Sequence, residues 1–239
     1  MSATPDSKAE TVPGPQKGRR GEFGKDIGAS LRSVREARGM GLRELARRVG
    51  VSASAISQIE TGRSRPSVET LYSIVQELGI ALDDLFPGEP GARPGARGTD
   101  PPVSSLVQPA ATRQSIDLES GVRWERLSPT TEPDVDFLYV TYEAGGSSSA
   151  TGALMRHTGR EYGLLLEGTL RVTVGFDSYL LHPGDSIVFD STMPHLLEAA
   201  NDEPAKAIWF VVGRRGSDAR KNELDAAATP AASEDGHQD

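Results

Sequence analysis

Three residues in the second half of the chain have side chains that can hold a metal or transfer a proton. His157 and Glu161 stand four positions apart in the segment MRHTGREYGLLLEG, and His195 follows in the segment MPHLLE. Two imidazoles and one carboxylate can bind Fe(II) or Zn(II) and leave coordination positions open. The same groups can instead line a pocket for the polar end of an organic molecule, or simply pack inside a barrel. Residue types and spacing leave these three interpretations open.

The composition excludes several classes of protein. The 239 residues suffice for one large or two small domains, and no apolar run approaches the roughly 18 residues of a membrane span. The absence of cysteine excludes disulfides and thiolate metal sites. The N-terminal segment MSATPDSKAETVPGPQKGRRGE lacks the apolar core of a signal peptide. We therefore expect a cytoplasmic protein with no membrane partner.

Charge is distributed unevenly along the chain. The net charge is −8, yet residues 17–65 contain twelve Lys or Arg and only five Asp or Glu. This basic region suits a polyanion such as DNA, whereas the acidic remainder would be repelled by one. Arginine-rich helices that are merely solvated show the same local excess, so charge alone does not decide the partner.

Composition also divides the chain into segments. Nine of the sixteen residues at 87–102 are glycine or proline, which suits a linker and neither a helix nor a central strand. The apolar spacing before it is helical, and short β-branched and aromatic runs follow it. We expect an α+β multidomain chain with a disordered arm at 1–22, an all-α bundle of four to five helices at 23–86, the linker at 87–102, an all-β barrel at 103–213 and an acidic disordered tail at 214–239.

The helical region shows start and stop signals for four helices. Ser52 and Ser67 are suitable N-caps, and Gly50 and Gly79 are suitable C-caps, around apolar residues at helical spacing. The second and third helices are separated by only a few residues, which is the helix-turn-helix arrangement whose second member enters the major groove. That second member begins with small or polar side chains that can approach bases, namely Ala53, Ser54, Ser57 and Gln58.

This region resembles the phage-repressor-like (XRE) helix-turn-helix family. The patterns LA-x3-GVS, IS-x-IE-x-G and PS-x3-L occur together, and the similarity runs from Asp26 to Phe86. Gly41 stands where the family usually has a Ser or Thr cap. The resemblance implies double-stranded DNA as a partner and a set of contact residues: Ala53, Ser54, Ser57 and Gln58 towards bases, Arg43, Thr61 and Arg63 towards phosphates, and the capping Ser52 beside them. A helical bundle that binds protein instead of DNA is the alternative.

The second region resembles the cupin superfamily of small antiparallel jelly-roll barrels. The first motif reads H-x3-E-x6-G from His157 to Gly168, and the second runs from Pro183-Gly184-Asp185 to His195. Together, the segments EYGLLLEG and LHPGDSIVF resemble cupin modules that follow XRE domains in bacterial regulators. Metal-binding cupins have a further histidine in the first motif, at the position of Met155 here, and a thioether is a poor ligand for Fe(II), Mn(II), Zn(II) or Ni(II).

The predicted ligand pocket therefore consists of Met155, His157, Glu161 and His195. A divalent metal, if one binds, would be Fe, Zn, Mn or Ni held by the last three residues. A pocket without an essential metal is the alternative at this point.

The combined architecture indicates a one-component transcriptional regulator that responds to a small-molecule effector. One helix-turn-helix buries little surface, so we expect a homodimer on a palindromic operator, held together by the barrels. A glycine- and proline-rich linker is a poor lever, so we expect an interdomain contact outside it to transmit the signal. One alternative is a metal-dependent cupin isomerase or dioxygenase with a DNA-binding appendage, and another is an adaptor whose barrel binds protein.

Overall fold

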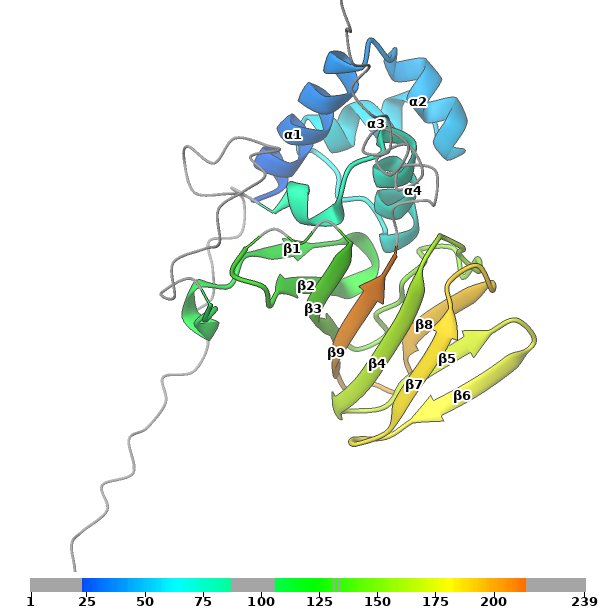
Figure 1. Ribbon diagram of the computed structural model, residues 1–239. Helices are drawn as coiled ribbons and strands as arrows, with labels where there is room; N and C mark the ends of the chain where they lie inside the picture. The colour runs from blue at the N-terminus through cyan, green and yellow to red at the C-terminus, as the bar shows by residue number, and fades with distance from the viewer. Residues whose placement is uncertain (1–22, 87–105, 131, 133, 214–239) are drawn as a thin grey trace, which may run out of the picture.

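The computed structural model describes residues 23–86, 106–130, 132 and 134–213. The helical region sits over one end of a β domain built from two antiparallel sheets (Figure 1). The expected arm, linker and tail, at 1–22, 87–102 and 214–239, lie outside the described residues. In the described part of the chain, no helix has the length and apolar character needed to cross a membrane.

The helical domain contains four α-helices with a short 3-10 helix after them. Their bounds are α1 Phe23–Ala37, α2 Leu42–Val49, α3 Ala53–Glu60, α4 Val68–Leu78 and η1 Leu82–Leu85. Ser52 and Ser67 cap α3 and α4 as predicted, because each side chain accepts a hydrogen bond from a backbone N–H three residues on. Gly50 and Gly79 end α2 and α4 in the left-handed conformation, which confirms both predicted C-caps. Gly41 precedes α2 and makes no side-chain cap.

Helix α4 has an apolar surface wider than one domain requires. Leu71, Ile74, Val75 and Leu78 are buried and belong to the helical core. Val68 and Tyr72 are buried as well, and they line a cavity together with residues of the β domain. The helix therefore packs against its own bundle and against the barrel at once.

The β domain has a six-stranded and a three-stranded sheet. The strand orders are β1-β2-β3-β9-β4-β7 and β6-β5-β8, with antiparallel pairing throughout. The strands are β1 Ser115–Asp117, β2 Val122–Arg126, β3 Val135–Tyr142, β4 Arg160–Glu167, β5 Leu170–Val174, β6 Asp177–Leu181, β7 Ser186–Asp190, β8 His195–Ala199 and β9 Ala205–Val212; the 3-10 turns are η3 Ala110–Thr112 and η4 Glu119–Gly121. Together with the helices, this confirms the expected α+β chain of a helical bundle followed by a jelly-roll barrel.

Strict alternation in β4 separates the inside of the barrel from the outside. Glu161, Gly163 and Leu165 are buried, whereas Tyr162, Leu164 and Leu166 are exposed on the other face. Tyr162 therefore points away from the pocket. The alternation consequently carries the carboxylate of Glu161 into the interior of the barrel.

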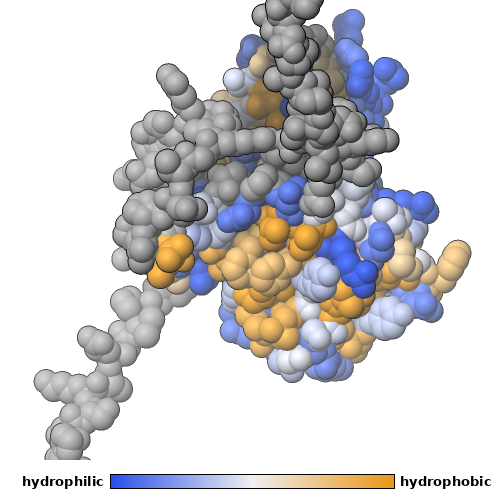
Figure 2. Space-filling view, viewed as in Figure 1, coloured by the Kyte–Doolittle hydropathy of each residue, from blue (hydrophilic) through white to orange (hydrophobic). Residues whose placement is uncertain are grey.

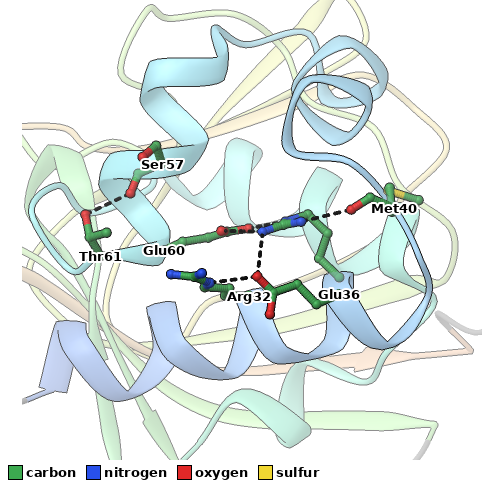
Figure 3. A network of polar contacts seen from close by, with 7 residues as sticks. Arg32, Glu36, Met40, Ser57, Glu60 and Thr61 are labelled. Atoms are coloured by element: carbon green, nitrogen blue, oxygen red, sulfur yellow. Dashed lines mark hydrogen bonds and ion pairs between the residues drawn. The ribbon is translucent and has the colours of Figure 1, made fainter.

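A buried ion pair joins the first helix to the third. The Nε and Nη2 atoms of Arg35 donate to the two carboxylate oxygens of Glu60, at 2.6 and 2.8 Å, and Nη1 donates to the carbonyl of Met40 at 2.9 Å. Both side chains are almost fully buried. Arg32 and Glu36 form a neighbouring, exposed pair on α1 (Figure 3). The buried pair thus fixes α3, the helix with the predicted base contacts, against α1 and the turn that leads into α2.

Replacing Arg35 should destabilise the helical domain strongly. Arg35→Met leaves the Glu60 carboxylate buried without its partner, a loss that costs about 3 kcal/mol or more. We expect a clear fall in the urea midpoint of the helical transition, followed by circular dichroism. Arg32→Met is the matched control, because its ion pair is exposed and should contribute little. Equal shifts for the two variants would show that the Arg35 pair does not anchor α3.

Candidate metal centre and nucleic-acid interface

The structure brings together the three residues that the spacing singled out. His157 lies just before β4, Glu161 on β4, and His195 at the start of β8. The Oε1 atom of Glu161 is 2.9 Å from Nε2 of His157 and 3.2 Å from Nε2 of His195. These three atoms all lie within 4.8 Å of one another, and the residues are 6, 4 and 1% exposed in chain order. Three potential ligand atoms therefore converge on one buried point.

Backbone carbonyls determine which nitrogen of each imidazole faces that point. Nδ1 of His157 lies 3.0 Å from the carbonyl of Thr158, and Nδ1 of His195 lies 2.8 Å from the carbonyl of Met193. A carbonyl oxygen only accepts hydrogen bonds, so both Nδ1 atoms carry the hydrogen. In a neutral ring, Nε2 then presents a lone pair. Metal-bound histidines use the same arrangement, with the other ring nitrogen donating to a carbonyl.

The converging atoms have no hydrogen-bond partner. Nε2 of His157, Nε2 of His195 and Oε1 of Glu161 are buried without one, although their separations fall within hydrogen-bond range. With both Nδ1 atoms carrying the hydrogen, two neutral rings have no N–H to donate to that oxygen. Three electron-rich atoms in an apolar interior need a proton or a cation among them. A divalent metal fits this donor set, because two imidazoles and a carboxylate are common ligands of such ions.

The second oxygen of Glu161 is held by a tryptophan. Trp209 on β9 donates its indole N–H to Oε2 over 2.8 Å. The indole can lie there because its partner across the strand pair is Gly163. A Cβ atom at position 163 would come within 2.0 Å of Cζ3 of Trp209. The glycine therefore makes room for the ring that orients the carboxylate.

The site favours an ionised carboxylate and a neutral imidazole. Burial is the largest influence on Glu161 and opposes its charge, but His157, His195 and the Trp209 N–H together outweigh it. The pKa of Glu161 consequently lies below its ordinary value. Burial lowers the pKa of His195, and the nearby Glu161 only partly offsets this. Both directions leave these groups in the protonation states in which they can bind a metal near neutral pH.

A small cavity surrounds the three ligand atoms. It offers about 20 Å³ to the centre of a water-sized sphere, which suffices for one water molecule or one ion. Met155, the fourth predicted pocket residue, lines it as well. The remaining lining residues are Val68, Tyr72, Trp124, Leu138, Val140, Tyr142, Ser148, Leu197 and Trp209. Most of this lining is apolar, and two of its members come from α4.

The predicted base-contacting side chains are mostly exposed on α3. Ser54, Ser57 and Gln58 are exposed, whereas Ala53 is half-buried against the helical core. Their common helix leaves the first turn accessible from outside. The structure therefore presents the residue types that the major groove requires on one short helix.

The predicted phosphate contacts fall into two groups. Arg43, on the first turn of α2, and Arg63, after α3, are exposed, and each guanidinium can reach outwards. The hydroxyl of Thr61 instead donates to the carbonyl of Ser57 over 2.8 Å at the end of α3 (Figure 3). The side-chain oxygen of Ser52 is also engaged within the helix, because it accepts a hydrogen bond from the Ala55 N–H. Thr61 would have to give up that hydrogen bond in order to donate to a phosphate.

Both parts of the chain match known families. Residues 31–85 match the helix-turn-helix family and residues 138–211 the cupin domain. The chain is 27% identical over 172 residues to the HTH-type transcriptional regulator PuuR of Escherichia coli, covering 70% of this chain and 84% of PuuR. It is 35% identical over 61 residues to the uncharacterized HTH-type transcriptional regulator y4dJ of Sinorhizobium fredii, covering 26% of this chain and 79% of that protein.

A solved structure shows the same fold. The crystal structure of an HTH_3-family transcriptional regulator from Vibrio cholerae matches with a TM-score of 0.58 and 23% identity, over 80% of this chain and 96% of that one. This chain belongs to the helix-turn-helix transcriptional regulators with a C-terminal cupin domain. It is a DNA-binding regulator in which the cupin carries the buried His-Glu-His site.

Sequence reasoning missed two residues of the regulator's site. Trp209 was not among the predicted site residues, yet it hydrogen-bonds to Glu161. Tyr72 was not singled out, although its ring centre lies 4.6 Å from that of His157. The available signal was the width of the apolar face on α4, where six of eleven residues are buried. A helix with two apolar faces predicts a second packing partner.

Enlarging Gly163 should disturb the site through Trp209. Gly163→Ala brings a methyl group against the indole ring, so the ring must move and the hydrogen bond to Glu161 is weakened or lost. We expect a changed tryptophan emission spectrum and about 10-fold weaker Co(II) binding, as for other partners of metal ligands. Leu164→Ala, next to it on the outer face, is the control and should leave both unchanged. A Gly163→Ala protein with unaltered emission would show that the ring is not held as described.

Proposed function

We propose that the regulator is a one-component sensor whose cupin pocket holds a divalent metal and uses it to recognise a small-molecule effector. The observation that carries this proposal is the set of three buried ligand atoms without hydrogen-bond partners. A pocket that bound only an organic molecule would not need three lone pairs aimed at one point. As a DNA-binding regulator, it acts in the cytoplasm.

His157, Glu161 and His195 would hold the metal. Two nitrogens and one oxygen suit Fe(II), Zn(II), Mn(II) or Ni(II), whereas the thioether of Met155 in the same cavity is a poor ligand for these ions. When bound, the metal supplies a Lewis acid with open positions. Trp209 keeps one carboxylate oxygen turned away from the ligand point, and the Thr158 and Met193 carbonyls hold the two rings. These contacts organise the site before any ligand arrives.

The same donor set would serve the alternative of an isomerase or dioxygenase with a DNA-binding appendage. The relatives that cover most of the chain are named as transcriptional regulators. These names favour sensing over turnover.

The outer face of the six-stranded sheet supports a dimer. Tyr162, Leu164 and Leu166 on β4 and Val188 on β7 are exposed side by side, because β4 and β7 pair directly. Figure 2 shows hydrophobic side chains gathered over this part of the barrel. Contiguous exposed apolar patches mark association surfaces. A second copy is the occupant we propose, because helix-turn-helix proteins read two half-sites with two chains.

Metal analysis tests the sensor site directly. Tag-free protein purified without chelator should contain roughly one equivalent of Fe, Zn, Mn or Ni per chain by mass spectrometry. His157→Ala removes one of three ligands and should lose that metal. His182→Ala is the matched control, because His182 is exposed and its ion-pair partner, Asp185, is not one of the three ligand residues. Retention of metal by His157→Ala, or no uptake by the native protein from any of these salts, would contradict the proposal.

DNA binding should separate base contacts from phosphate contacts. Gln58→Ala should relax the preference at one base pair per half-site, by about 1–3 kcal/mol. Arg43→Ala should weaken binding to every DNA sequence. It should also reduce the slope of the logarithm of the binding constant against the logarithm of salt concentration by about one unit. Footprinting and salt titrations measure both effects, with exposed Arg171→Ala on the barrel as control. If Gln58→Ala leaves specificity unchanged, α3 does not lie in the groove as proposed.

A further inference from the structure

One wall of the cupin cavity belongs to the DNA-binding domain. Val68 and Tyr72 of α4 line it opposite residues of the barrel. The Tyr72 ring packs between two pocket rings, with its centre 4.6 Å from that of His157 and 5.2 Å from that of Trp124. Tyr72 is buried although it lies on the surface of its own helical bundle. The helix therefore covers the ligand atoms as a separate, removable wall.

The other walls are held in place by backbone hydrogen bonds. Strands β3, β4 and β9 are each paired on both sides within the six-stranded sheet. The loop at Ser148 is attached to β8, because its N–H donates to the carbonyl of Leu197 and its hydroxyl accepts from the Leu197 N–H. Opening the cavity through these walls would break sheet hydrogen bonds. Opening it at α4 would break side-chain packing and a few polar contacts.

Those polar contacts lie around the edge of the α4 interface. The N–H of Glu69 donates to the carbonyl of Ser148 at 3.3 Å, and the hydroxyl of Ser149 donates to the Glu69 carboxylate at 3.2 Å. The N–H of Glu119 donates to the carbonyl of Pro66 at 2.9 Å. Arg65 and Asp117 form a long ion pair of 3.8 Å. Water can replace such contacts at low cost once the interface opens.

The cavity accepts an ion and is too narrow beside the ligand atoms for an organic ligand. The centre of a water-sized sphere can occupy only about 20 Å³ of it, which is room for about one water molecule. Helix α4 cannot move by itself, because Leu71, Ile74 and Leu78 bind it to the helical core. An organic molecule that enters on the α4 side must therefore displace the whole DNA-binding domain from the barrel.

We propose that Tyr72 is the lid of the cupin pocket, so that an organic effector at the metal and a docked DNA-binding domain exclude each other. This inference rests on the proposed metal site. A divalent ion with one carboxylate ligand carries a net charge of +1, which favours a monoanionic effector. The apolar lining by Trp124, Leu138 and Val140 suits a hydrophobic body on that anion.

The exclusion supplies a coupling between the two sites. A ligand shifts a two-state equilibrium only when it distinguishes the states, and here it binds only the undocked one. The coupling is reciprocal. Any DNA that selects the docked arrangement must therefore lower the affinity for the effector by the same factor by which the effector lowers the affinity for that DNA. In a dimer, docking on two barrels fixes the distance between the two α3 helices. Effector binding then changes that distance without using the linker.

A disulfide across the interface tests the lid. The native chain has no cysteine, so Glu69→Cys with Ser149→Cys introduces a single possible disulfide at a native contact. Both tryptophans of the chain line the cavity, and acrylamide quenching of their emission therefore reports access to it. We expect quenching about tenfold slower in the oxidised protein than in the same protein after reduction. The disulfide prevents the opening of the interface through which acrylamide reaches the tryptophans. This readout needs neither metal nor effector.

Substitution of the lid provides the second variant. Tyr72→Ala should increase acrylamide quenching above the native rate, whereas Tyr72→Phe keeps the ring and should increase it far less. In Co(II)-loaded protein, removal of the metal by pyridine-2,6-dicarboxylate should follow the same order: oxidised double-cysteine slowest, Tyr72→Ala fastest. Equal quenching in oxidised and reduced protein, or in Tyr72→Ala and native protein, overturns the lid. A protein that takes up no metal but shows the expected quenching refutes the metal site and leaves the lid standing.

Discussion

A carboxylate buried beside two imidazoles is the constraint on which the rest of the regulator depends. Glu161 is carried inward by the alternation of β4, and an unsatisfied charge there would oppose folding. The surrounding structure answers this in several ways: Trp209 donates to one oxygen, Gly163 makes room for the indole, and the Thr158 and Met193 carbonyls turn both imidazoles towards the other oxygen. Such an arrangement of lone pairs is completed by a proton or a cation.

The buried His-Glu-His site contacts the DNA-binding domain at the ring of Tyr72. Tyr72 packs on His157, so whatever fixes or displaces that imidazole acts on α4 directly. Helix α4 also contributes to the core that holds α2. The Arg35–Glu60 ion pair in the same domain fixes α3 against α1. A rigid helical domain is what allows a change at the barrel to become a change in the position of α3.

Much of this structure was predictable from local patterns. Serine caps, glycine stops and apolar spacing predicted the four helices, and the alternating runs predicted a β barrel. The spacing of His157, Glu161 and His195 predicted one site, and the structure brings the three together. Strands β1 and β2 are short and carry charged residues such as Asp117 and Arg123, so the sequence pattern indicates them only weakly. Local patterns report periodicity and do not show which segments pair.

The contacts that could not be predicted are those between distant segments. The bond between Trp209 and Glu161 depends on the register of β9 against β4, and the packing of Tyr72 depends on how two domains meet. Yet α4 already indicates a second partner, since its buried residues exceed the stripe that one bundle can cover. Sensing requires an interface that is stable when the pocket is closed and weak enough to open. Val68 and Tyr72, within a rim of exchangeable polar contacts, are the part of this interface that lies over the pocket.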